Sequence, residues 1–98
     1  MDANFDLRQL RQFVALAQEC HFGRAAKRLN MTQPALTQAI QRLESALEAR
    51  LFERHQRRVE LSPAGAALLP RARQLIDAAA AMGPAARAAA AGLAGHLR

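Results

Sequence analysis

The stretch of residues 24–47 limits the fold most, because two helical patterns lie only three residues apart in it. The first pattern is short and covers about residues 24–29. The second begins after Thr32, a favourable N-cap, and carries Pro34 in its first turn, where the missing N–H is no loss. Two helices joined by so short a turn form the helix-turn-helix arrangement.

The second of these helices is amphipathic. Its apolar side chains recur at helical spacing, which predicts a buried stripe made of Leu36, Ile40, Leu43 and Leu47. The opposite face carries amides, hydroxyls and one guanidinium: Gln33, Thr37, Gln38, Gln41, Arg42 and Ser45. No acidic residue on it precedes Glu44, so this face does not repel phosphate. Side chains of these types bind base edges in DNA, and the alternative is an ordinary solvated surface.

A helix and a hairpin flank this pair. Asp6 followed by Gln9 is a capping box, which predicts a first helix over residues 7–19. After Leu51 the apolar side chains recur at about every second residue, as in a strand. This predicts a two-stranded hairpin with the basic stretch of residues 55–58 at its tip. Such a tip would lie on a duplex as a wing. It lacks the Asn-Gly pair of tight hairpins, and a solvated loop is the alternative.

A long helix follows over residues 63–92, begun by Ser62 as the N-cap. Its apolar side chains alternate spacings of four and three, the pattern of a helix that pairs with a second helix. The predicted dimer interface consists of Leu68, Ala72, Leu75, Ala79, Met82 and Ala86. We expect Pro84 to kink or end the helix near Met82.

Positive charge is uneven along the chain. The 98 residues carry 14 Arg or Lys against 8 Asp or Glu, a net charge of +6. Residues 20–58 alone hold eight of the basic groups against three Glu, so the excess gathers around the predicted helix-turn-helix. A polyanion such as DNA, RNA or an anionic membrane surface is therefore the expected partner.

Composition disfavours several other classes of protein. The chain has room for one core, and it contains neither a long apolar run nor a secretory signal, so we expect a cytoplasmic protein with no membrane segment. Cys20 is the only cysteine, which excludes an internal disulfide, and the scattered histidines offer no clustered zinc ligands. Cys20 and His21 are adjacent, an arrangement in which side chains seldom face each other. We therefore expect no enzyme.

Two other binding functions are also disfavoured. An RNA-binding module needs aromatic platforms, but the chain has no Tyr or Trp and its four Phe fall at core spacing. A protein-binding module that used only the alanine-rich last helix would leave the acid-free face of residues 33–42 without a role.

Taken in order, the motifs resemble the N-terminal DNA-binding domain of LysR-type transcriptional regulators. They are Phe22-Gly23-Arg24-Ala25-Ala26, Thr32-Gln33-Pro34-Ala35-Leu36-Thr37-Gln38, Leu51-Phe52-Glu53-Arg54 and Leu61-Ser62-Pro63-Ala64-Gly65. The resemblance implies a mainly α fold, with a winged helix-turn-helix of three helices and a small two-stranded wing over residues 1–62. The linker helix over 63–92 would pair with its copy in a homodimer, and residues 93–98 would lead into the first strand of a missing effector-binding domain.

The resemblance also implies how the chain acts. A recognition helix of about residues 32–48 would enter the major groove of double-stranded DNA at a two-fold-related site, with the wing on the backbone or minor groove. The implied DNA-binding residues, together with the basic wing tip, are Arg24, Lys27, Thr32, Gln33, Pro34, Ala35, Thr37, Gln38, Arg42, Arg54, Arg57 and Arg58. No cofactor is expected for these 98 residues. A small-molecule effector and a higher oligomer are implied for the intact protein.

Three residues depart from the family's pattern. Gly23 stands where Ser or Thr is common, which removes a hydroxyl that could contact phosphate. Gln38 stands where Arg or Lys is frequent, which favours adenine over guanine. Glu48 replaces the glycine that usually ends the recognition helix, so the helix should run on or end in a strained residue.

Overall fold

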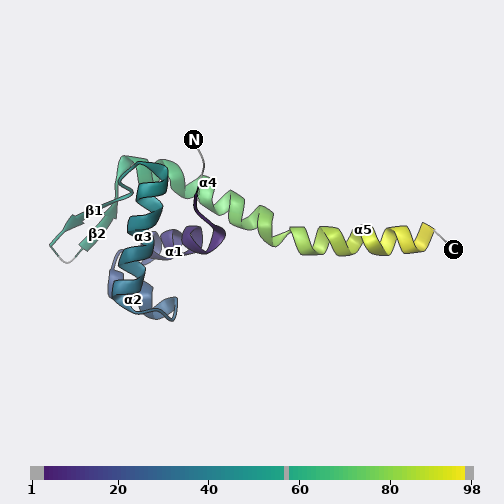
Figure 1. Ribbon diagram of the computed structural model, residues 1–98, viewed down its shortest axis with the longest axis horizontal. Helices are drawn as coiled ribbons and strands as arrows, with labels where there is room; N and C mark the ends of the chain where they lie inside the picture. Colours follow the sequence, from purple (N-terminus) through teal and green to yellow (C-terminus); the bar gives the residue numbers. More distant parts are fainter. Residues whose placement is uncertain (1–3, 57, 97–98) are drawn as a thin grey trace.

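The computed structural model describes residues 4–56 and 58–96, and it is mainly helical (Figure 1). Its elements are α1 (Leu7–Glu19), α2 (Phe22–Arg28), α3 (Gln33–Leu47), β1 (Phe52–His55), β2 (Arg58–Leu61), α4 (Pro63–Ala80) and α5 (Met82–His96). Three helices and a two-stranded wing form one globular part, from which α4 and α5 extend to one side (Figure 1). The predicted winged helix-turn-helix with a long helical extension is confirmed.

The capping box at the start of α1 is confirmed. The Asp6 carboxylate accepts from the Gln9 N–H at 2.9 Å, and the Gln9 side-chain oxygen accepts from the Asp6 N–H at 3.0 Å. α2 begins at Phe22, two residues earlier than expected, because His21 serves as its N-cap and accepts the Arg24 N–H on Nδ1 at 3.0 Å. Histidine is not a usual N-cap, so no local sequence signal marks this start.

The core lies where α1, α2, α3 and the base of the wing meet. Its largest fully buried side chains are Leu10, Phe13, Leu16, Leu36, Leu43 and Leu51. The rings of Phe13 and Phe52 pack with their centroids 5.4 Å apart, which ties the wing to α1. The predicted apolar stripe of α3 is buried as expected, apart from Leu47 at its end, which is only partly buried.

α3 ends in a strained residue, one of the two outcomes expected there. Glu48 adopts a left-handed conformation with φ 54°, and its N–H bonds to the carbonyls of Glu44 and Ser45. A glycine would adopt this conformation without the steric cost that a side chain brings. The helix therefore stops after Leu47 and turns toward the wing.

The wing is a tight antiparallel hairpin. β1 and β2 pair from Phe52 opposite Leu61 to His55 opposite Arg58, so the tip is two residues long. Gln56 supplies the left-handed conformation that such a turn requires, with φ 56°, in place of the Asn that is usual there. The predicted hairpin is confirmed, whereas Arg57 lies outside the described residues.

α4 starts in direct contact with the segment that leads into the wing. Its N-cap Ser62 accepts the Gly65 N–H at 3.0 Å, as the sequence predicts. A Cβ atom on Gly65 would overlap the carbonyl oxygen of Leu51, so only glycine fits at this close approach.

The linker consists of two helices. α4 continues through Pro70 to Ala80, and Ala81 separates it from α5, whose first turn contains Pro84. The expected interruption near Met82 is confirmed, so the predicted single helix over 63–92 is divided. α5 extends through residues 93–96, where we expected a lead-in to a strand, and residues 97–98 lie outside the described part.

One residue of the predicted dimer interface, Ala72, is buried within the chain itself. Ala72 is 2% exposed and belongs to the chain's own core, and the half-buried Leu68 packs against that core. The reason is that α4 packs against α1 through a stripe that continues to Ile76. A side chain already covered by its own chain has no surface left for a partner, so Ala72 was misplaced. Leu75 is 48% exposed and Met82 is 70% exposed, so the chain itself leaves both side chains accessible.

Candidate nucleic-acid interface

The outward side of α3 forms a shallow, acid-free groove. We call it the reading face, and it is lined by Gln33, Pro34, Thr37, Gln38 and Gln41. Thr37 is half-buried, and the other four side chains are exposed. The apolar stripe of α3 faces the core, so the helix presents these polar side chains to the outside as the sequence predicts. Amides exposed in this way have free donors and acceptors for base edges.

The start of α3 is fixed by its cap. The Thr32 hydroxyl accepts the Ala35 N–H at 3.3 Å, which leaves its own proton available to a phosphate oxygen. Thr32 is exposed and Ala35 is half-buried. The structure therefore brings both predicted residues to the same end of the helix as Gln33 and Pro34.

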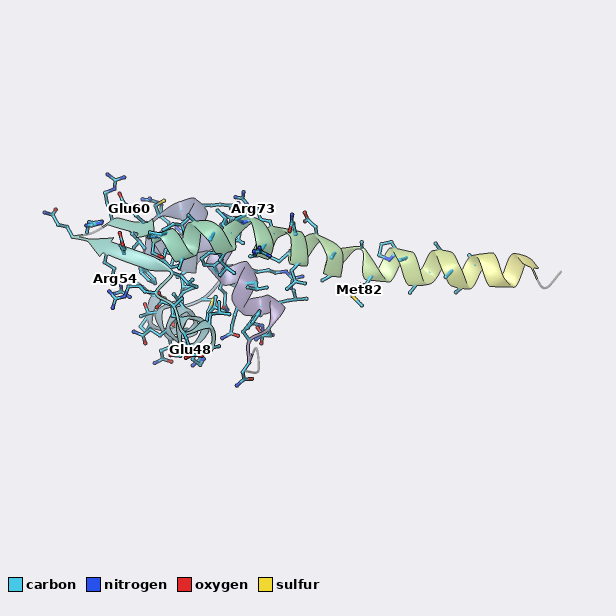
Figure 2. All side chains as sticks on the ribbon, turned by 90° about the horizontal axis from the view of Figure 1, so that it is seen from above. Glu48, Arg54, Glu60, Arg73 and Met82 are labelled. Carbon is cyan, nitrogen blue, oxygen red and sulfur yellow. The ribbon has the colours of Figure 1, made fainter. Side chains whose placement is uncertain are left out.

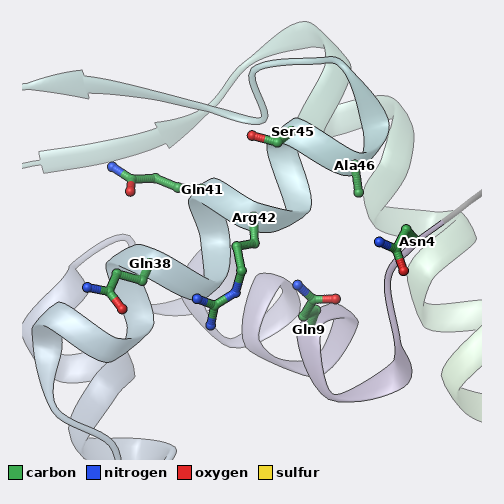
Figure 3. A pocket seen from close by; sticks show the side chains of 7 residues that line it. All are labelled: Asn4, Gln9, Gln38, Gln41, Arg42, Ser45 and Ala46. Atoms are coloured by element: carbon green, nitrogen blue, oxygen red, sulfur yellow. The ribbon is translucent and has the colours of Figure 1, made fainter.

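A second hollow separates α3 from the N-terminal end of α1 (Figure 3). Figure 3 shows Gln38, Arg42 and Ser45 on successive turns of α3, across from Asn4 and Gln9. Arg42 is exposed, and no carboxylate lies within ion-pair distance of it in residues 4–56 and 58–96. Its charge is therefore available to phosphate on the side of α3 that faces away from the wing.

The wing borders the reading face on the other side. A hollow lined by Gln41, Arg50 and Arg54 lies between α3 and β1, and Arg54 and Arg58 line a neighbouring hollow beside Gln33. Because side chains alternate along a strand, Arg54 lies on the inner face of the wing together with Phe52. Figure 2 shows its side chain at the edge of the molecule below the wing. The wing thus adds positive charge next to the polar groove.

The two predicted contacts on α2 are not equivalent. Arg24 donates to the backbone carbonyl of Glu19 at 2.9 Å and lies 3.7 Å from the Glu19 carboxylate. That carboxylate also accepts from Arg28 at 3.3 Å. Lys27 is exposed and forms no ion pair within the described part of the chain. Glu19 partly neutralises Arg24, so Lys27 is the freer of the two cations on this helix.

The linker carries the remaining predicted residues. We call Leu75, Ala79, Met82 and Ala86 the linker stripe, and of these Ala79 is half-buried while the others are exposed. Met82 projects from the junction of α4 and α5, well away from the globular part (Figure 2). An exposed Leu and Met at helical spacing form an apolar surface that this chain leaves uncovered.

Cys20 and His21, which are adjacent in the sequence, do not bond to each other in the structure. The Cys20 thiol donates to the carbonyl of Ala17 while His21 caps α2, so each has its own backbone partner. No group of three potential metal ligands occurs among the residues that the structure describes. None of the helices in this part of the chain combines the length and the hydrophobicity that a membrane-spanning helix needs.

Two residues outside the predicted contacts belong to this surface. Gln41 lines the reading face, and its position one helical turn after Gln38 is the signal that identifies it. Phe22 is 9% exposed and lies beneath the Arg54 guanidinium. No sequence spacing indicates that second contact, because it joins α2 to the wing.

Comparison with known proteins identifies a family with this architecture. Residues 7–66 match the model of the family described as bacterial regulatory helix-turn-helix protein, lysR family. The HTH-type transcriptional regulator IlvR of Caulobacter vibrioides is 48% identical over 92 residues, which cover 94% of this chain and 31% of IlvR. The chain spans about a quarter to a third of the length of several curated relatives that it matches, IlvR among them.

Two solved DNA complexes share the fold. The CbnR DNA-binding domain in complex with DNA has a TM-score of 0.85 and 42% identity, covering 88% of this chain and 99% of that one. The BenM DNA-binding domain with catB site 1 DNA has a TM-score of 0.83 and 36% identity, covering 90% of this chain and 95% of that one.

Proposed function

The chain belongs to the LysR family of bacterial regulatory helix-turn-helix proteins, and from this we propose that it recognises a specific double-stranded DNA sequence as a dimer. Regulation of transcription through DNA binding is the function that its relatives share. The observation that carries the finer proposal is the exposed, acid-free reading face of α3, with Arg54 and Arg42 on its two sides.

In this proposal α3 enters the major groove. Gln33, Gln38 and Gln41 offer amide donors and acceptors in the pattern that suits adenine, and Pro34 and Thr37 offer apolar contact to thymine methyls. Arg42 on one side and the wing on the other would contact the phosphates that border the groove. Direct base contacts would give specificity, while the flanking cations would fix the register.

The second half of the proposal is pairing through the linker. α5 packs mainly against α4, and its side chains over residues 84–92 are exposed. The linker stripe offers Leu75 and Met82 to a second copy of the chain, and two copies would place two reading faces on a two-fold-related site. The predicted higher oligomer and small-molecule effector concern a longer protein and stay proposals, as do the cytoplasmic location and the absence of enzymatic activity.

Gel-shift titration against fragments of the source genome tests this function. We expect a subset of fragments to bind much more tightly than the rest at moderate salt, with affinity falling steeply as salt rises. Equal affinity for every fragment would rule out specific recognition and leave only attraction between a basic chain and a polyanion.

A further inference from the structure

Arg54 is held in place by an aromatic ring instead of a carboxylate. Its guanidinium carbon lies 4.7 Å from the centroid of the Phe22 ring. Phe22 is itself 9% exposed and anchored in the core at the first residue of α2, so the ring has little freedom to move. A guanidinium over an aromatic face at this distance is attracted by the negative potential of the ring.

An acidic side chain close to Arg54 is already engaged in hydrogen bonds to the backbone. Glu44 lines the same hollow as Arg54, but its carboxylate accepts the N–H groups of Leu51 at 2.7 Å and Phe52 at 3.4 Å. Arg54 forms no ion pair within residues 4–56 and 58–96. The contrast is Arg24, which Glu19 holds and partly neutralises. A ring fixes a guanidinium without cancelling its charge.

We propose that Phe22 is a positioning residue for DNA binding, which orders the Arg54 guanidinium between the wing and α3 and leaves its full charge for a backbone phosphate. This inference rests on the proposed function, because it assigns a phosphate contact on the same surface. An arginine that is ordered before binding loses less side-chain entropy when it meets the phosphate.

A double-mutant cycle tests this pairing with a labelled duplex of random sequence, since a backbone contact needs no particular operator. Phe22→Leu keeps an apolar side chain in the core but removes the ring, and we expect it to weaken binding about three- to tenfold. In an Arg54→Ala background the same change should have no further effect. Phe22→Tyr, which retains the ring, should bind like the unmodified chain.

The salt dependence of DNA binding distinguishes a residue that positions a cation from the residue that carries the charge. Arg54→Ala removes a cation and should lower the slope of log Kd against log salt by about 0.9. Phe22→Leu leaves every cation in place, so its slope should be unchanged although its affinity falls. The matched control is Phe22→Leu combined with Arg42→Ala, whose effects on binding should add, because Arg42 lies on the other side of α3.

One measurement needs no variant. In the unmodified chain, the δ protons of Arg54 should show an upfield ring-current shift by NMR, and its absence would overturn the inference even if Phe22→Leu failed to fold. Equal weakening by Phe22→Leu with and without the Arg54 side chain would likewise show that Phe22 acts only through the core. If the unmodified chain bound no duplex at all, the proposed function would fail together with this inference.

Discussion

Glu44 on the last turn of α3 accepts the Leu51 N–H with its Oε2 2.7 Å from the nitrogen. Leu51 is 1% exposed, so this N–H has no access to water and depends on the carboxylate. The single acidic side chain of α3, Glu44, thus joins this helix to the segment that leads into the wing. The Glu44 carboxylate does not line the reading face, where it would repel phosphate.

We expect Glu44→Ala to destabilise the chain by about 1–3 kcal/mol, because a buried donor would lose its partner. Glu44→Gln keeps an acceptor of the same length and should cost less. Urea unfolding followed by circular dichroism measures both, with Glu60→Ala in the exposed outer face of the wing as the control. An Ala variant as stable as the control would mean that this hydrogen bond contributes nothing.

Glu48→Gly should stabilise the chain by about 1 kcal/mol. The residue has φ 54°, a conformation that is costly for a side chain and free for glycine, and the greater flexibility of unfolded glycine offsets only part of that gain. Glu48→Ala is the matched control, since it changes the charge but keeps the strain. The midpoint temperature of thermal unfolding should rise for Glu48→Gly and stay unchanged for Glu48→Ala. A rise of the same size in both would trace the effect to charge.

The sequence predicted those parts of the fold that follow from local signals. The caps at Asp6, Thr32 and Ser62 and the buried stripe of α3 all lie within a few residues of the pattern that indicates them. The misplaced residue, Ala72, depends on tertiary packing, because only the contact of α4 with α1 decides which apolar stripe the core covers. The start of α2 was missed because its capping group is an unusual one, His21.

The candidate site divides in the same way. Spacing on one helix is enough to collect the reading face, including Gln41, which lies a turn beyond Gln38. The pairing of Arg24 with Glu19 and the stacking of Arg54 on Phe22 join different elements. Neither contact follows from the period of a helix or a strand. The sequence alone therefore could not show that Arg24 is partly neutralised while Arg54 keeps its charge for phosphate.

Gln33→Ala should weaken binding to a selected duplex by about 1–3 kcal/mol and have little effect on random DNA, because a bidentate base contact is lost only where the right base is present. Gln74→Ala is a suitable control, since Gln74 is an exposed glutamine on α4 outside the predicted interface. Fluorescence anisotropy with the two duplexes measures the difference. Equal losses on both would assign Gln33 to the DNA backbone.

Leu75→Asp should convert dimers to monomers in sedimentation experiments, because a carboxylate at the start of the linker stripe would have to be buried against an apolar partner. Gln74→Asp adds the same charge to a neighbouring exposed position and should leave the dimer intact. A Leu75→Asp chain that sediments as a dimer would show that the two copies meet through another surface.

Selection of bound duplexes from a random-sequence library tests sequence specificity and two-fold symmetry in one experiment. If the chain reads a specific sequence as a dimer, the enriched duplexes will share two copies of one short half-site, related by a two-fold axis and spaced by about one helical turn or a multiple of it. Sequences that remain random after repeated selection, although the chain retains DNA, would contradict specific recognition by a dimer.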